Sequence, residues 1–219
     1  MAVKKKAAEP VVRVSSAPAT LEKALADPKA VKALIDALGE SGKLMRSESA
    51  EVIHEVAQTQ PRLLSGYAPQ LIDALGRPES QTRWEILGAL EAFVSVDARA
   101  VSKAIEAATT ALHDTESSVV REAAFRMLAA FGSTTARRSE QVWPLLDEAL
   151  RCYHGDAEYP GMLSGLVRLL EGSATEPVRV AAAVTVSNDV NHPRAIIRGR
   201  ARRITALAPK VEVPEEEAQ

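Results

Sequence analysis

Two helix signatures alternate along the hydrophobic pattern of this chain. The first is the segment Ile35-Asp-Ala-Leu-Gly39, which recurs as Ile72-Asp-Ala-Leu-Gly76 after 37 residues. Each copy follows a proline, suited to the first turn of a helix, and ends on a glycine, favoured just after a helix C-terminus. Weaker copies lie at residues 107–113 and 143–150. We predict that these segments are the first helices of a repeated helix pair.

The second signature begins with an arginine. Arg46, Arg83 and Arg121 follow one another at intervals of 37 and 38 residues, and apolar residues lie four, seven and ten positions after each. This spacing places the apolar side chains on one face of a helix. A single pair of such helices leaves one flank uncovered, so neighbouring pairs must stack. The pattern therefore predicts an all-α fold, an α-solenoid of about five helical hairpins.

The pattern becomes looser after residue 150. We predict a loop at residues 153–160, a helix that ends at Gly172, a short helix at about residues 177–187 and a closing helix at about residues 193–208. Residues 21–209 then form a single solenoid domain. The arm at residues 1–20 is rich in Pro, Ala and Ser, and the tail at residues 210–219 is rich in Glu. Both are predicted to be disordered.

Two stretches resemble the HEAT repeat family. Trp143-Pro-Leu-Leu is similar to the start of the family's first helix, and Asp114-Thr-Glu-Ser-Ser-Val-Val-Arg121 is similar to its acidic turn and Val-Arg start of the second helix. In the first two repeats, Gly39-Glu40 and Arg77-Pro-Glu79 stand in place of the Asp. The resemblance covers about residues 28–208. It implies that the second helices line a concave face and the first helices a convex back.

Composition narrows the function classes. Aromatic residues make up only 4% of the chain, which argues against an aromatic-lined ligand pocket. Cys152 is the only cysteine and the four histidines are scattered, so we expect no disulfide, metal site or catalytic centre. No nucleotide-binding or hydrolase motif is present, so we expect no cofactor and no enzymatic activity. The absence of a long apolar run or a signal peptide core predicts a soluble, cytoplasmic protein without a membrane partner.

Candidate binding residues gather in two regions. The predicted concave face carries acidic residues that suit a basic protein partner, together with Trp84, which has the character of an interface anchor. An equal alternative is that Trp84 fills a gap between repeats. The candidate partner-binding residues of this face are Glu48, Glu51, Glu55, Trp84, Glu85 and Arg126.

The closing helix carries Arg194, Arg198 and Arg202 at intervals of four. This ridge is suited to phosphates or to an acidic protein surface. The alternative is a solvated cap whose charges favour a helix C-terminus.

Two main functions follow from these features. The first is a non-enzymatic scaffold that binds a protein partner through its concave face. The second is nucleic-acid binding through the basic closing helix. A DNA alkylation repair glycosylase built from HEAT-like repeats is the enzymatic form of this hypothesis, although such enzymes are more basic and more aromatic along their inner face than this chain. A bilin-lyase-like role on a chromophore or its carrier is a more remote option.

Overall fold

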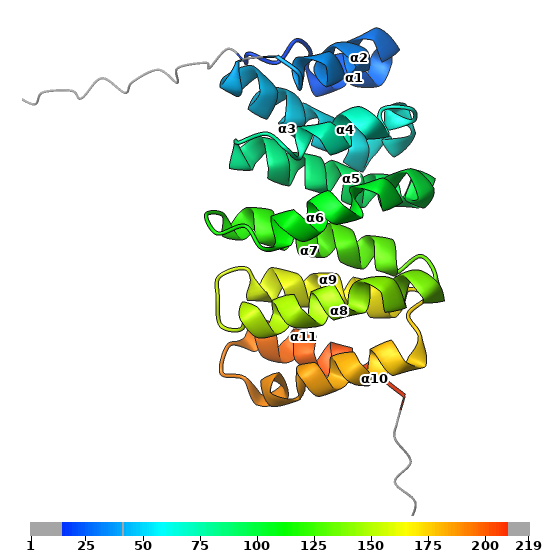
Figure 1. Ribbon diagram of the computed structural model, residues 1–219, viewed down its shortest axis with the longest axis vertical. Helices are drawn as coiled ribbons and strands as arrows, with labels where there is room; N and C mark the ends of the chain where they lie inside the picture. Colours follow the sequence, from blue (N-terminus) through cyan, green and yellow to red (C-terminus); the bar gives the residue numbers. More distant parts are fainter. Residues whose placement is uncertain (1–14, 41, 210–219) are drawn as a thin grey trace, which may run out of the picture.

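The computed structural model describes residues 15–40 and 42–209. Its helices are α1 (Leu21–Ala26), α2 (Pro28–Ala37), α3 (Lys43–Thr59), η1 (Pro61–Leu64), α4 (Ala68–Ala74), α5 (Ser80–Val101), η2 (Ser102–Ala104), α6 (Ile105–Leu112), α7 (Ser118–Gly132), α8 (Ala136–Cys152), α9 (Tyr159–Glu171), α10 (Glu176–Thr185), η3 (Ser187–Asn191) and α11 (Ala195–Ala206). From α2 onward they pair as five hairpins stacked along the long axis of the molecule (Figure 1).

The second helices of the hairpins form the continuous layer of the stack. Helices α3, α5, α7, α9 and α11 pack against one another in chain order, whereas α2, α4, α6, α8 and α10 lie on the other side. We call the first set the second-helix layer and the other set the first-helix layer. One hydrophobic core, largely of Ala, Leu and Val, runs between the layers through all five hairpins. The predicted all-α solenoid is confirmed.

Prolines and capping residues set where most of these helices begin. Pro28 lies in the first turn of α2, where Asp27 accepts a hydrogen bond from the Lys29 N–H at 2.9 Å, and Pro69 lies in the first turn of α4. A proline suits this place because the first-turn N–H groups have no partner within the helix. Ser117 caps α7 in the same way, accepting from the Val120 N–H.

The fourth hairpin differs from the sequence prediction. Trp143 and Pro144 were expected at the start of a first helix, but α8 begins at Ala136, after the N-cap Thr135, and Pro144 lies inside it. Pro144 is exposed, so its ring faces away from the core. The predicted loop at residues 153–160 is shorter than expected, because α9 already begins at Tyr159 with Pro160 in its first turn. Gly155, at φ 92°, makes the turn.

The two predicted flanks are only partly within the described residues. Residues 15–20, which the sequence assigns to the arm, lie against α3: the Ser15 hydroxyl donates to Glu48 at 3.0 Å, and Ala19 is buried. Helix α1 then packs across α2 and α3. Residues 1–14 and the predicted acidic tail at 210–219 lie outside the described residues. The N-terminal hairpin is therefore covered by residues 15–26.

Candidate interaction surface

The periodic arginines tie each repeat to the next. Arg46 pairs with Glu79, Arg83 with Asp114 and Arg121 with Glu158. Each acid lies in the turn just before the next helix of the second-helix layer. Glu79 and Glu158 are N-cap residues, and Asp114 accepts hydrogen bonds from the N–H groups of Glu116 and Ser117 at 3.0 and 2.7 Å. The three pairs thus form a ladder of arginine and acid along the stack, with glutamates at two of its three steps. It fixes the register of α3, α5, α7 and α9.

Burial and hydrogen bonding set the pKa of two of these acids. The hydrogen bond from Arg46 lowers the pKa of Glu79 and outweighs the opposing effect of burial. Burial alone would raise the pKa of Asp114, but the hydrogen bonds from Arg83 and from two backbone N–H groups more than offset it, so that this pKa is also lowered. Both carboxylates therefore stabilise the folded stack in their charged form.

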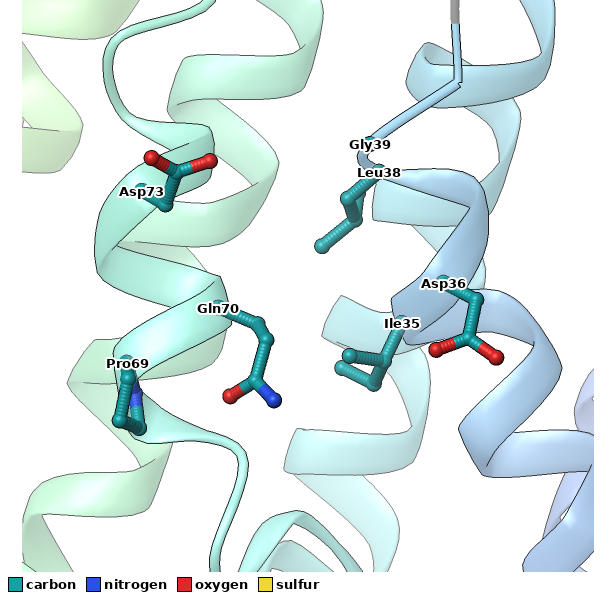
Figure 2. A pocket seen from close by; sticks show the side chains of 7 residues that line it. All are labelled: Ile35, Asp36, Leu38, Gly39, Pro69, Gln70 and Asp73. Atoms are coloured by element: carbon teal, nitrogen blue, oxygen red, sulfur yellow. The ribbon is translucent and has the colours of Figure 1, made fainter.

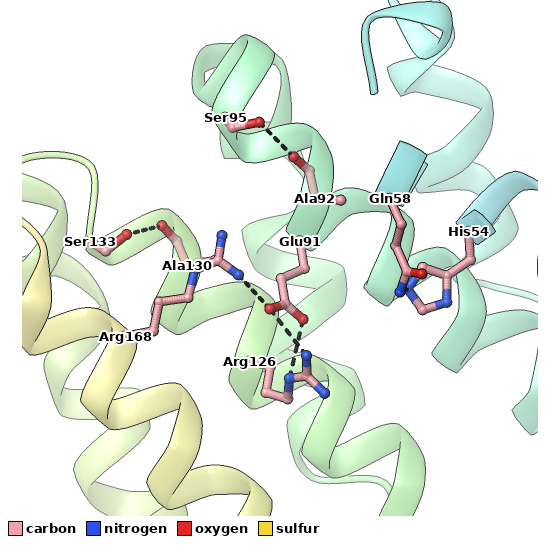
Figure 3. A network of polar contacts seen from close by, with 9 residues as sticks. All are labelled: His54, Gln58, Glu91, Ala92, Ser95, Arg126, Ala130, Ser133 and Arg168. Atoms are coloured by element: carbon pink, nitrogen blue, oxygen red, sulfur yellow. Dashed lines mark hydrogen bonds and ion pairs between the residues drawn. The ribbon is translucent and has the colours of Figure 1, made fainter. Parts of the chain in front are cut away.

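A second ionic cluster spans three helices of the second-helix layer (Figure 3). Glu91 on α5 is almost buried and accepts from Arg168 of α9, with Nη1 and Oε1 2.5 Å apart. The Nε of Arg126, on α7 between them, lies 3.3 Å from the other carboxylate oxygen. One carboxylate thus holds two guanidinium groups from the two following repeats. This arrangement fixes the direction of Arg126 and Arg168 on the open face of the layer.

His54 joins α3 to α5 beside this cluster. Its Nδ1 lies 2.7 Å from a carboxylate oxygen of Glu85, and its Nε2 lies 3.1 Å from the amide nitrogen of Gln58. The imidazole rests against Gly88, where a Cβ atom would lie 2.4 Å from the ring. Glycine at this position therefore provides the space for the ring, and the ring in turn positions the Glu85 carboxylate.

A hollow of about 250 Å³ opens between α5 and α7 on the same face. Trp84 and Glu85 contribute from α5, and Val119, Glu122, Ala123 and Arg126 contribute from α7. Trp84 is half-buried and packs against the core, whereas Val119 is 46% exposed. The hollow thus combines an aromatic ring, small apolar side chains and charged groups of both signs.

Glu122 is the half-buried acid of this hollow. Its carboxylate lies over the first turn of α9, where a Cβ atom at Gly161 would stand 2.0 Å from the Glu122 Cδ. Burial raises the pKa of Glu122, and the nearby Arg126 and Arg200 only partly offset this. Within residues 15–40 and 42–209, no hydrogen bond or ion pair forms to this carboxylate. Glu122 is therefore a partly desolvated charge without a fixed counter-ion.

The structure brings together three of the nine predicted binding residues. Trp84, Glu85 and Arg126 line the hollow. Glu51 is exposed on α3, in line with His54 at helical spacing. Glu48 and Glu55 lie apart, because Glu48 accepts from Ser15 and Glu55 lines a separate hollow against residues 15–23. The expected acidic patch on α3 is thus divided between two directions.

Two of the three arginines of the predicted ridge on α11 make local contacts. Arg198 donates to the carbonyl oxygens of His192 and Pro193, at 2.7 and 3.1 Å, and Arg202 donates to that of Val190 at 2.9 Å. Arg194 is exposed at the N-cap. Two of the three guanidinium groups therefore hold the preceding turn against α11.

Another hollow lies between α2 and α4 of the first-helix layer (Figure 2). It encloses about 390 Å³ between the two copies of the Ile-Asp-Ala-Leu-Gly segment. Its carboxylates are already paired with residues four positions away along the chain, Asp36 with Lys32 at 2.6 Å and Asp73 with Arg77 at 3.1 Å. This hollow is a gap between repeats whose charges are locally balanced.

Searches among known proteins extend this description. No protein-family description matches the chain, and no curated protein matches it. Solved structures do match. An engineered protein is 19% identical, with 89% of this chain and 87% of that one covered and a TM-score of 0.69. A designed armadillo repeat protein in complex with peptide (KR)4 is 15% identical, with 89% and 88% covered and a TM-score of 0.69.

A natural protein shares the architecture as well. The archaeal HEAT-like repeats protein from Thermococcus onnurineus NA1 is 13% identical over 85% of this chain and 90% of its own, with a TM-score of 0.50. The fold is a HEAT-like α-solenoid. The resemblance of the repeat segments to HEAT sequences is thereby confirmed at the level of the fold. In this HEAT-like stack, the open side of the second-helix layer is the surface that the sequence assigned to the concave face.

Sequence reasoning missed several residues of this HEAT-like surface, namely Val119, Glu122, Ala123 and Arg168. A signal for one of them exists. Glu122 directly follows Arg121, as Trp84 directly follows Arg83, so the two occupy the same position in successive repeats. Arg168 carries no such signal, because the arginine period does not continue into α9.

The described residues include no group of three or more His, Cys, Asp or Glu side chains placed to hold a metal ion. None of their helices combines the length and apolar character needed to span a bilayer.

Proposed function

We propose that this protein is a non-enzymatic scaffold that binds a protein partner through the second-helix layer, centred on the hollow between α5 and α7. The observation that carries the proposal is the composition of that hollow: Trp84 lies beside Glu85, Glu122 and Arg126 on an otherwise open helix layer. A tryptophan in a pocket, surrounded by polar groups, is typical of the few residues that dominate binding energy at protein interfaces.

The surroundings of the hollow support this proposal because they hold its side chains in place. His54 positions Glu85, and Glu91 positions Arg126. A surface whose groups are fixed before binding loses less conformational entropy when a partner docks. The designed armadillo repeat protein of the same fold, bound to peptide (KR)4, shows that a stack of this architecture supports peptide recognition.

Nucleic-acid binding through α11 receives less support. Two of its three ridge arginines hold backbone carbonyl groups of the preceding turn, which leaves fewer guanidinium groups directed to solvent for phosphates. We therefore favour a protein partner and treat nucleic acid as an outcome of the experiment below. The cytoplasmic location stays a prediction.

The experiment compares two matched arginine substitutions in affinity capture from the native cell. Ala123→Arg places a long side chain in the hollow, and Glu148→Arg places the same residue on the exposed side of α8 in the first-helix layer. We expect Ala123→Arg to lose most of the captured protein and Glu148→Arg to retain it, with circular dichroism confirming that both variants fold. Equal recovery by the two variants would contradict the proposal. Loss of recovery after nuclease treatment would indicate nucleic acid instead.

A further inference from the structure

We infer that the hollow between α5 and α7 accepts a lysine or arginine side chain of the partner, which lies on Trp84 and pairs with Glu122. This inference rests on the proposed function, because it names the chemistry of the group that the same surface receives.

Each of the other charged groups around the hollow has a hydrogen bond or ion pair of its own, whereas Glu122 has none among the described residues. Arg126 is directed to Glu91, which also holds Arg168. Glu85 is held through one of its oxygens by His54. Arg200, from α11, donates to the carbonyl oxygen of Pro160. The Glu122 carboxylate is left without a fixed partner among the described residues, although it is half-buried.

The burial of Glu122 determines which kind of partner side chain the hollow can accept. A carboxylate of the partner would meet both Glu85 and Glu122, which repel it. An apolar side chain would remove more water from Glu122 without supplying a hydrogen bond, which is unfavourable for a charged group. A cationic side chain supplies the missing counter-charge, and hydrogen bonds between charged groups are stronger than those between neutral ones.

Trp84 adds a second reason for a cation. The face of an indole ring attracts an ammonium or guanidinium group, and the apolar stem of lysine or arginine packs on the same surface. Ala123 and Val119 provide the small and apolar walls beside it. The acidic side chain of Glu51, exposed on α3, extends the negative character of the face toward the N-terminal end.

The fluorescence of Trp84 makes this inference testable. Trp84 and Trp143 are the only tryptophans, so the variant Trp143→Phe reports on the hollow alone. Three ten-residue peptides of alternating serine and one other residue serve as probes, with lysine, glutamate or glutamine as that residue. We expect the lysine peptide to change the emission with a Kd that rises with salt, and the other two peptides to have no effect.

Substitution of Glu122 then identifies the group that holds the cation. Glu122→Gln in the same background should raise the Kd of the lysine peptide roughly tenfold. Because burial raises the pKa of Glu122, the glutamine variant should fold at least as stably as the parent chain. Gly161→Ala, which would push the carboxylate from its place over α9, should also weaken binding. Glu148→Gln, on the first-helix layer, is the control and should leave the Kd unchanged.

The outcomes separate this inference from the proposed function. If the glutamine or glutamate peptide binds as well as the lysine peptide, the choice of a cation is wrong, while the layer still binds peptides. If Glu122→Gln leaves the Kd of the lysine peptide unchanged, Glu122 is not the counter-ion. If no peptide changes the emission, the cation site is overturned, and the capture experiment with Ala123→Arg and Glu148→Arg still decides the proposed function.

Discussion

Arg46 shows how one side chain can connect two repeats. It is 8% exposed, its Nε donates to Glu79 at 3.2 Å, and Nη1 donates to the carbonyl oxygen of Glu40 in its own repeat. Arg121 repeats this arrangement with Glu158 and with the carbonyl oxygen of Asp114. Arg179, within the described part of the chain, donates to carbonyl oxygens alone, among them that of Gly172 at 2.9 Å. The same residue type thus holds the turn that precedes its own helix and, in α3 and α7, pairs with the N-cap residue of the next helix of the second-helix layer.

For these side chains, the sequence predicted the arginines but not all of their partners. The interval of 37 or 38 residues located Arg46, Arg83 and Arg121 directly. Their acids vary in type and in distance along the chain, because the turns between the helices differ in length. Glu122 was missed for another reason: a single glutamate on a helix has the same appearance in a sequence whether it is solvated or half-buried over a glycine of the next repeat.

The first prediction concerns the buried pair of Arg46 and Glu79. Glu79→Ala leaves the Arg46 guanidinium buried without its counter-charge, which is more destabilising than the loss of a surface pair. We expect the midpoint of thermal unfolding to fall by several degrees. Asp36→Ala removes the exposed pair with Lys32 and should change it little, since surface pairs contribute little to stability. Similar midpoints for the two variants would contradict the role of the ladder.

The helices themselves were largely predictable because their apolar period and their terminal residues agree. The predicted closing helix at about residues 193–208 corresponds to α11, and the predicted segment at residues 107–113 corresponds to α6 (Ile105–Leu112). The start of α8 was not predictable from Trp143-Pro144, because an exposed proline can be accommodated inside a helix when the core face is unaffected. The low helix propensity of Pro144 did not end α8, because the apolar residues on the core face of that helix remain buried.

The second prediction concerns the junction between α9 and α10. Gly172 lies so close to α7 that a Cβ atom would stand 2.3 Å from the backbone oxygen of Ser133, which also accepts the Ser173 N–H at 2.7 Å. Because the neighbouring atom belongs to the backbone, it cannot move aside as a side chain does. Gly172→Ala should therefore lower the free energy of unfolding by about 1–3 kcal/mol, measured by urea denaturation.

Gly199 provides the matched control for this substitution. It lies in α11 with no atom within 4 Å of the position of an added Cβ. Gly199→Ala should raise the free energy of unfolding by about 0.5–1 kcal/mol, the difference in helix propensity between the two residues. We therefore expect the two substitutions to change the free energy of unfolding in opposite directions. No loss of stability in Gly172→Ala would show that residue 172 packs less closely against the end of α7 than described. A loss of stability in Gly199→Ala would show that the space around residue 199 is not open.

The whole molecule is a stack whose interfaces contain buried ion pairs as well as a hydrophobic core. The second-helix layer carries the ladder of Arg46, Arg83 and Arg121 and the cluster around Glu91. The sequence predicted the number of hairpins, because the repeat is visible in it. It could not predict the hollow, because the hollow depends on how α5 and α7 lie relative to each other and on the ion pair of Arg126 with Glu91.

The third prediction is the dependence of stability on pH. The pKa values of Glu79 and Asp114 are lowered in the folded state, so their contribution is fully present above the ordinary carboxyl pKa and is lost as the pH falls through the lowered values. The midpoint temperature of thermal unfolding should therefore decrease when the pH is lowered below about 4. Glu79→Gln should be less stable at pH 7 and lose less on acidification. If the unfolding midpoint of this variant depends on pH as that of the parent chain does, Glu79 is not a main cause of the loss of stability in acid.

The most direct test of the central claim is site-specific photo-cross-linking in the native cell. A photoreactive residue in place of Ala123 lies in the hollow of the second-helix layer, and the same residue in place of Glu148 lies on the first-helix layer. If the second-helix layer is the binding surface, a discrete protein adduct forms from position 123 and none forms from position 148. An adduct from position 148 alone, or equal adducts from both positions, would contradict it.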